Sequence, residues 1–238
     1  MQMKLFVGPA TPKGDFAKIG ARFGMIEVRA DRPMPRAATL RAWRKDAGPH
    51  FVFSVVLPRS VSELGPNALK DPGLADAIEA ARLLEARCIL LATPATVRPT
   101  TTYRDRIAAL VERLPKSPTI LAWEPSGLWE AEEIRQTART VQILPVLDAA
   151  KDELLPGSVV YTRLRALGGA SSIGQAALQH AADQLRGRRE AFVIVENGSD
   201  AHRTKVALEG ALERSPSLGG GVVVRPVPGR LRAEDEEQ

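Results

Sequence analysis

The sequence predicts an α/β fold, namely a variant TIM (β/α)₈ barrel in which one crossover helix is missing or very short. Three observations lead to this prediction: eight short apolar runs of β type, helical periodicity in the segments between them, and one connection that is too short for a helix. Parallel strands need connections of a dozen or more residues, so this alternation is typical of a parallel sheet covered by helices. A doubly wound open sheet is the alternative, because periodicity does not show whether the sheet closes.

The expected strands are short and rich in β-branched residues, and four of them end at a proline, whose missing N–H interrupts the ladder. They are KLFVGP (4–9), MIEVRA (25–30), FVFSVVLP (51–58), CILLATP (88–94), TILAWEP (119–125), QILPVLD (142–148), SVVYTRLRA (158–166) and AFVIVEN (191–197).

The expected helices follow these strands and show a period of 3.6 residues. In one of them Tyr103, Ile107, Leu110, Val111 and Leu114 form a single apolar stripe. The helices are expected over 15–22, 36–47, 71–87, 101–114, 130–141, 175–187 and 201–214. The connection AAKDELLPG, nine residues after the sixth strand, is too short for a standard helix with its turns.

The length of the chain allows one large α/β domain or two small ones. A chain of 238 residues can bury a sizeable core without disulfides, and we expect a single domain over 1–215. The tail 216–238 combines glycines, prolines and an acidic end, so we expect it to be partly disordered. The single cysteine, Cys88, lies in an apolar run, which excludes a disulfide framework and favours a buried thiol.

The charge and the apolar runs limit the partners. The formal net charge is +5, and a basic body accepts anionic partners, including nucleic acid, without requiring them. There is no signal-peptide pattern and no apolar stretch approaching about 18 residues, so we expect no membrane partner and a cytoplasmic location.

Several segments resemble, in the same order, those of the YecE-like proteins, also called domain-of-unknown-function family 72. WEPSGLW (123–129) resembles the family's Trp/Phe-Glu-Pro-Arg-Gly-x-Trp segment, and FVG, MIEVRA, VVYTRLRALG and FVIVENGSDA match other family strands between residues 4 and about 212. The resemblance implies a TIM barrel with no settled activity. Arg29, Val56, Ser126 and Arg165 replace family residues, which identifies a diverged member.

Functional groups of a TIM barrel lie where strands end and the following loops begin. Residues two apart on a strand share a face, so Tyr161, Arg163 and Arg165 are expected to point into the barrel together, as are Glu27 and Arg29. Converging guanidinium groups bind phosphate or carboxylate bidentately, and this predicts an anion site. The expected ligand-binding residues are Arg29, Arg59, Trp129, Tyr161, Arg163, Arg165 and Asn197.

An internal salt network from Glu27 or Glu124 to Arg163, which would hold the barrel together, is the alternative, and it is compatible with a ligand site.

Glu124 is the candidate catalytic residue. A carboxyl group beside an indole is desolvated, which suits a general acid or base. Pro125 ends the strand and Gly127 allows a sharp turn that would return Trp129 over the mouth as a stacking lid. In the alternative interpretation Trp123 and Trp129 fill the core and Glu124 pairs with an arginine.

Metal and cofactor chemistry are not expected. The three histidines, His50, His180 and His202, fall away from the mouth, although a carboxylate-only Mg²⁺ site from Glu27, Glu124 and Asp148 stays open. The loop GGASSIG (168–174) is typical either of phosphate binding on backbone N–H groups or of a capping box from Ser172 to Gln175.

Three functions therefore stay open. The first is binding of a phosphorylated or carboxylated small molecule in an arginine-rich cavity at the C-terminal mouth, with or without catalysis. The others are a nucleic-acid-binding barrel and a diverged, non-catalytic scaffold. The sequence specifies neither the oligomeric state nor the reaction.

Overall fold

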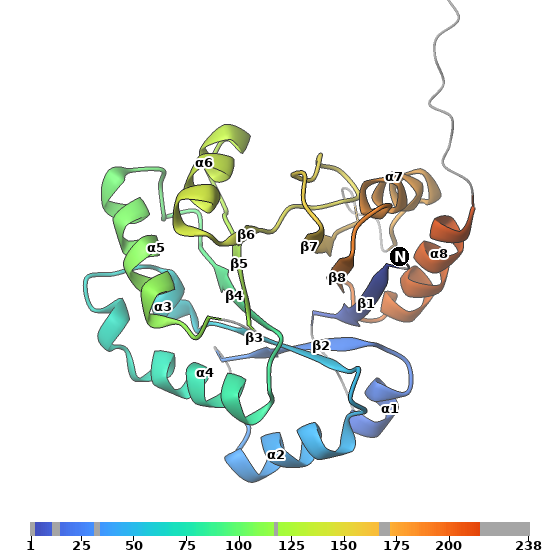
Figure 1. Ribbon diagram of the computed structural model, residues 1–238, viewed down its shortest axis with the longest axis horizontal. Coiled ribbons are helices and arrows are strands. Elements are labelled where there is room, and N and C mark those ends of the chain that lie inside the picture. Colours follow the sequence, from blue (N-terminus) through green and yellow to red (C-terminus); the bar gives the residue numbers. More distant parts are fainter. Residues whose placement is uncertain (1–2, 11–14, 31–33, 117–118, 167–171, 215–238) are drawn as a thin grey trace, which may run out of the picture.

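The computed structural model describes residues 3–10, 15–30, 34–116, 119–166 and 172–214. Eight strands form the inner layer and the helices surround them (Figure 1). The strands are β1 (Lys4–Pro9), β2 (Met25–Arg29), β3 (Val52–Val56), β4 (Cys88–Ala92), β5 (Ile120–Glu124), β6 (Leu144–Pro145), β7 (Val159–Leu164) and β8 (Glu190–Val195).

All strand pairs are parallel, in two hydrogen-bonded sheets. One sheet has the order β2-β3-β4-β5-β6 and the other has the order β1-β8-β7. The sheets meet at two seams. At the β1–β2 seam the Gly24 N–H donates to the Val7 carbonyl at 3.1 Å, and at the β6–β7 seam an isolated parallel bridge joins Leu147 to Thr162. The strands thus follow the order of a barrel, and the predicted α/β class is confirmed.

Gly8 permits the close approach at the β1–β2 seam. A Cβ atom at this position would lie 2.0 Å from the carbonyl oxygen of Met25, far inside van der Waals contact. Only glycine lets the two backbones come this close.

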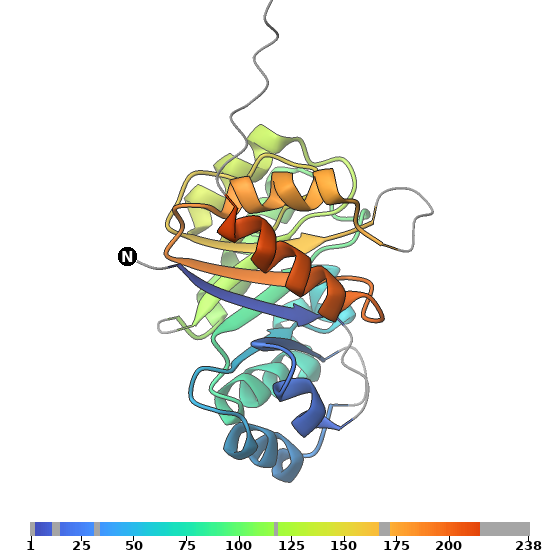
Figure 2. The ribbon, with the colours of Figure 1, turned by 90° about the vertical axis from the view of Figure 1, so that its right-hand side faces the viewer.

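The predicted helices all form, close to their expected bounds. They are α1 (Phe16–Gly20), α2 (Ala37–Asp46), α4 (Pro72–Leu83), α5 (Thr101–Arg113), α6 (Ala131–Val141), α7 (Gln175–Leu185) and α8 (Ala201–Glu213). No periodicity in the sequence predicts the short α3 (Arg59–Ser62) or the 3₁₀ turn η1 (Ala68–Lys70), which lie between β3 and α4. In Figure 2, α7 and α8 lie over the sheet that contains β1 and β8.

The missing crossover helix is confirmed. Residues 146–158, all of which the structure describes, contain no helix, and the Asp148 carbonyl closes a single turn by accepting the N–H groups of Lys151 and Asp152. Arg188 then fixes the segment by donating to the carbonyls of Leu155 and Gly157 at 2.8 and 2.6 Å. The place of a helix is taken by one turn followed by irregular backbone, which the Arg188 side chain holds by these hydrogen bonds.

Two sequence expectations change in detail. The sixth strand is expected over 142–148 but is limited to Leu144–Pro145 at the edge of the five-stranded sheet, and Pro145 has no N–H to donate to a ladder. Helix α7 begins with Gly174 as its N-cap and without a side-chain capping bond, so Ser172 does not form the expected capping box. The rest of that loop, 167–171, and the tail 216–238 lie outside the described residues.

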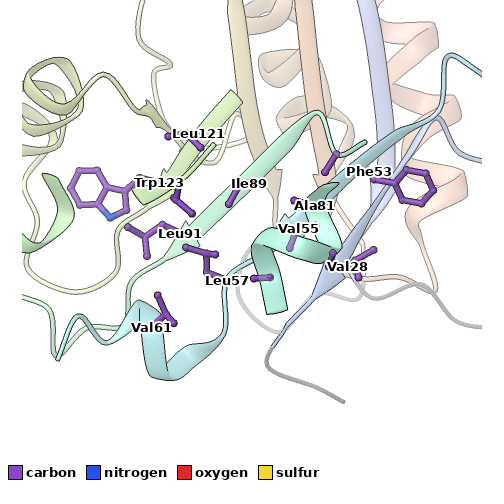
Figure 3. Packing of buried hydrophobic residues seen from close by; sticks show 14 of the residues in the cluster. Val28, Phe53, Val55, Leu57, Val61, Ala81, Ile89, Leu91, Leu121 and Trp123 are labelled. Atoms are coloured by element: carbon purple, nitrogen blue, oxygen red, sulfur yellow. The ribbon is translucent and has the colours of Figure 1, made fainter. Parts of the chain in front are cut away.

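The core has an inner and an outer part. Inward-facing strand residues fill the barrel: Met25, Val52, Val56, Cys88, Leu90, Ala122, Val146, Tyr161, Phe192 and Ile194. The alternate residues pack against the helices, and Figure 3 shows Val55, Ile89 and Trp123 on that side, with Ala81 of α4. Burial raises the pKa of the Cys88 thiol, as befits a packing residue. In the described part of the chain, no helix has the length and apolar character needed to cross a membrane.

Candidate functional site

The inward face of β7 runs from the centre of the barrel to its C-terminal mouth. Tyr161 belongs to the inner core, Arg163 follows it, and Arg165 lies just beyond the end of the strand. Parallel pairing sets Arg163 beside Ile194 of β8, and the ladder continues with a hydrogen bond from the Glu196 N–H to the Leu164 carbonyl at 3.1 Å. The strand therefore presents one phenol and two guanidinium groups in a row.

The inner end of this row is a buried network. The Tyr161 hydroxyl donates to Glu27 Oε1 at 2.5 Å, and Ser54 Oγ lies 3.1 Å from the same hydroxyl. Arg163 Nη2 lies 2.7 and 2.6 Å from the two oxygens of Glu27. We call Glu27, Tyr161 and Arg163 the floor of the site; none of them is more than 3% exposed.

Arg163 is the centre of the network, because three carboxylates surround its guanidinium. Besides Glu27, Glu196 Oε1 lies 2.5 Å from Nη1 and Glu124 Oε2 lies 3.0 Å from Nε. The contact to Glu124 is close but poorly aligned, and Nε has no well-oriented hydrogen-bond acceptor among the described residues. Strands β2 and β5 and the residue that follows β8 thus each contribute a carboxylate to one buried charge.

Arg165 belongs to the same network but reaches the surface. Its Nη2 pairs with Glu124 Oε1 and lies 3.3 Å from Glu196 Oε1, while 45% of the side chain stays exposed. Its backbone N–H donates to Asp148 Oδ2 at 3.3 Å. We call Glu124, Arg165 and Glu196 the rim of the site.

Burial and charge shift the titration of the floor and rim in different directions. Burial raises the pKa of Glu27 above its ordinary value, against the charge of Arg163 and the hydrogen bond from Tyr161. Burial alone would also raise the pKa of Glu196, but the charges of Arg163, Arg165 and Arg29 lower it below its ordinary value.

Asp148, at the edge of the mouth, has a raised pKa, as Glu27 of the floor does. Burial raises its pKa, although hydrogen bonds from the N–H groups of Ala150 and Arg165 oppose the shift.

A cavity of about 810 Å³ opens beside the rim, between α6 and the segment that replaces the missing helix. Three of its lining residues are cationic: Arg135 from α6, Lys151 from the segment and Arg165 from the rim. Four are acidic: Glu124, Asp148, Asp152 and Glu153. The cavity is therefore mixed in charge, with cations contributed by separate elements.

The expected residues are only partly brought together. Tyr161, Arg163 and Arg165 point into the barrel, as alternation predicts, and Arg29 lies close enough to Glu196 to affect its pKa. The side chain of Glu124 meets two guanidinium groups, which is the ion-paired alternative that the sequence left open.

The remaining expected residues lie elsewhere. Arg59 begins α3 and pairs with Glu63 at 2.9 Å, with 77% of its side chain exposed. Asn197 accepts a hydrogen bond from the Ser199 hydroxyl at 2.7 Å in the turn before α8.

The expectation that Trp129 forms a lid is wrong. Trp129 is 8% exposed, its indole N–H donates to the Val97 carbonyl at 2.8 Å, and its ring packs edge-to-face on Trp123 at 4.8 Å between centroids. Gly127 does supply the turn, at φ 88°, but it directs the indole into the layer between strands and helices. Trp129 remains one of the residues that line the cavity.

Sequence reasoning missed Glu196 and Ser54. The signal for Glu196 was present, because Phe192, Ile194 and Glu196 are spaced two apart, so the glutamate continues the inward face of β8. Ser54 holds the corresponding inward position on β3. Lys151 and Arg135 carried no signal, since a lysine in a turn and an arginine on a helix are ordinary surface residues.

Metal ligands do not gather in the part of the chain that the structure describes: no group of three or more His, Cys, Asp or Glu side chains is arranged to hold an ion. His180 lies on α7, and His202 on α8 packs edge-on against Phe23 at 6.2 Å between ring centroids.

Comparison with models of known protein families identifies one family to which this chain belongs. The family model described as "Protein of unknown function DUF72" matches residues 18–216. No curated protein matches the chain.

Solved structures with the same fold include two described as DUF72 family proteins. One, from Enterococcus faecalis, has a TM-score of 0.69 at 14% identity, covering 90% of this chain and 96% of its own. The other, from Thermotoga maritima, has a TM-score of 0.66 at 17% identity, covering 89% and 100%. A structure described as an AP endonuclease, family 2, from Brucella melitensis has a TM-score of 0.59 at 12% identity, covering 90% and 99%. At these identities the likeness shows the fold alone.

Proposed function

This chain belongs to the DUF72 family of proteins of unknown function, and from that premise we propose that it binds a phosphorylated or carboxylated small molecule in the cavity beside Arg165. The observation that carries the proposal is the position of this guanidinium. It is held by the buried network on one side, and 45% of the side chain is exposed on the side of the cavity.

Two of the four carboxylates that line the cavity are engaged by other groups and therefore oppose an anionic ligand less. Both oxygens of Glu124 face guanidinium groups, and both oxygens of Asp148 accept backbone N–H groups, so these two carboxylates are already engaged. Lys151 and Arg135 line the same cavity and add two cationic groups to its walls, although Arg135 also lies 3.3 Å from Glu132. Guanidinium and ammonium groups from separate elements suit a phosphate or carboxylate, which accepts several charge-assisted hydrogen bonds.

The floor supports this site without touching the ligand. Glu27 and Tyr161 fix Arg163, and Arg163 in turn fixes Glu124 and Glu196, which hold Arg165. In this proposal Tyr161 and Arg163 are positioning residues.

Glu124 is the group that would transfer a proton if the protein is an enzyme. A ligand anion that engages Arg165 competes with Glu124 Oε1 for the guanidinium, while Oε2 stays beside Arg163. Ligand binding would thereby free one carboxylate oxygen toward the cavity, where it can accept a proton.

The test is a thermal-shift screen against phosphorylated and carboxylated metabolites. A ligand that binds the folded state raises the melting temperature, and the increase should disappear in Arg165→Gln. Arg59→Gln is the matched control, because this arginine is more exposed and pairs with Glu63, the C-cap residue of α3. If Arg165→Gln retains the shift, the ligand binds elsewhere; if no compound shifts the wild type, a protein scaffold becomes the better hypothesis.

Nucleic acid is the second candidate ligand. The net charge of +5 favours it, and so does the shared fold with a structure described as an AP endonuclease. Short single- and double-stranded oligonucleotides in the same screen test this, because such binding weakens steeply as salt rises.

A further inference from the structure

A second cavity, of about 240 Å³, continues the mouth cavity along α6. The two cavities share two lining residues, Leu147 and Leu155. Both belong to the segment 146–158 that replaces the missing helix, and both residues of β6 (Leu144–Pro145) also line the second cavity. The mouth cavity therefore leads, past these two leucines, into a further space beside β6.

One face of α6 lines both cavities. Ala131, Ile134 and Arg135 line the mouth cavity, and Ala138 and Arg139 line the second one. Residues three and four apart are neighbours on a helix surface, so these five positions form one stripe along α6. In a regular barrel the next crossover helix would lie beside this face, but here β6 and β7 are joined by a loop (Figure 1). The missing helix thus accounts for a groove that runs along α6 from the mouth.

The groove has a charged end and an apolar end. The mouth end contains the cationic groups described above, with Arg165 of the rim among them. In the second cavity, Arg139 is the one charged residue among the described residues that line it. Most of the other lining residues are apolar, and they include Leu144, Leu147, Leu154, Leu155 and Val159. A ligand that extends along the groove therefore leaves a charged environment for a hydrocarbon one.

We propose that the anion bound at the mouth is amphiphilic, with its phosphate or carboxylate head at Arg165 and a hydrocarbon body in the apolar end of the groove. This inference rests on the proposed function and specifies the class of ligand. The guanidinium group supplies charge-assisted hydrogen bonds to the head, and the apolar walls favour removal of the body from water. Because Leu147 and Leu155 line both cavities, a hydrocarbon chain attached to the head passes between the two ends at these residues.

The test is calorimetric titration of the full chain with alkyl phosphates of different lengths. Each methylene that becomes buried strengthens binding about fourfold, so octyl phosphate should bind at least about tenfold more tightly than ethyl phosphate. Octanoate and butyrate give the same comparison for a carboxylate head. Octyltrimethylammonium, which has the same body and the opposite charge, should bind at least about tenfold more weakly than octyl phosphate.

Two variants separate the body of the ligand from its head. Leu155→Asn replaces an apolar wall of the groove by an amide, so it should weaken binding of octyl phosphate at least about fivefold and leave that of ethyl phosphate unchanged. Arg165→Gln should weaken binding of both. Leu128→Asn is the matched control for the first variant, because this leucine is 71% exposed and lines neither cavity. If Leu155→Asn does not fold, the comparison of chain lengths in the wild type still decides.

Three outcomes would overturn the inference while leaving the mouth proposal to the metabolite screen. They are equal affinities of the wild type for the short and long members of both series, a chain-length effect that is unchanged in Leu155→Asn, and no binding of either octyl phosphate or octanoate. Binding of octyl phosphate that is weakened by Leu155→Asn but unchanged in Arg165→Gln would instead contradict the mouth proposal itself, and with it the position of the head.

Discussion

Arg163 and Arg165 lie two residues apart on one face of one strand, yet their surroundings are opposite. The Arg163 side chain is 4% exposed and is surrounded by three carboxylates, whereas the Arg165 side chain is 45% exposed and borders a cavity. The floor and the rim thus contain the same residue types in different environments. The difference teaches that depth along the barrel axis, and not residue type, decides whether an arginine stabilises the fold or remains available to a ligand.

Replacement of Arg163 should have the largest effect. Arg163→Met leaves Glu27 buried without its counter-charge, and removing one partner of a buried ion pair costs about 3–5 kcal/mol of unfolding free energy. Urea unfolding followed by circular dichroism measures this. If Arg163→Met and Arg165→Met lowered the free energy of unfolding by similar amounts, the distinction between floor and rim would be wrong.

Removal of both floor charges should lower the free energy of unfolding by less than the sum of the two single replacements. In Glu27→Gln/Arg163→Met the uncompensated carboxylate is gone, so we expect the double variant to recover roughly 1–3 kcal/mol relative to the sum of the two single changes. A double-mutant cycle in urea gives this coupling energy. A coupling energy of zero would mean that the contacts between Glu27 and Arg163 contribute no pairwise free energy to stability.

The floor and the rim should respond to pH in opposite directions. Arg163, Arg165 and Arg29 lower the folded-state pKa of Glu196, so its contribution to stability is present above the unfolded value of about 4.3 and is lost as pH falls through the lower, folded value. The stability difference between wild type and Glu196→Gln should therefore shrink on acidification, and should not exceed about 1 kcal/mol at this partly exposed site.

For Glu27, whose pKa is raised by burial, the change of stability with pH has the opposite sign. Its folded state holds the proton more tightly, so the wild type should lose stability relative to Glu27→Gln as pH rises from about 4.3 through the folded value. Unfolding curves at several pH values between about 3 and 7 test both slopes. Parallel slopes for the two variants would contradict the comparison.

Replacement of Arg165 should have the smallest effect on stability. Its pairs with Glu124 and Glu196 are partly solvated, so Arg165→Gln should change the unfolding free energy by less than about 1 kcal/mol. The same variant should abolish the thermal shift produced by an anionic ligand at the mouth. A large stability loss in Arg165→Gln would assign this residue to the floor.

Most of the fold follows from patterns that are local in the sequence. Strands and helices have periods of 2 and 3.6, and these periods located every main element as well as the missing crossover helix. The length of β6 was misjudged because Pro145 falls inside an apolar run, and the sequence does not show on which side a strand is paired.

The site is less predictable, because it depends on distances between strands. Alternation placed Tyr161, Arg163 and Arg165 on one face, and the same rule would have placed Glu196 there had it been applied to β8. The direction of the Trp129 ring depended on an acceptor in another loop, the Val97 carbonyl. No periodicity in the sequence predicts a hydrogen bond between two loops.

The sheet order also determines how the chain can fold during synthesis. Each strand from β2 to β6 pairs with its neighbour in sequence, so these five can assemble as soon as they are made. β1, which precedes the other seven described strands in the sequence, pairs with β8, which follows them, so this contact joins residues that are far apart in the sequence. Until β8 (Glu190–Val195) is available, β1 has an unpaired edge that can associate with other chains. We therefore expect β1 to be among the last of these strands to be fully paired, and its unpaired edge to favour aggregation of the nascent chain until then.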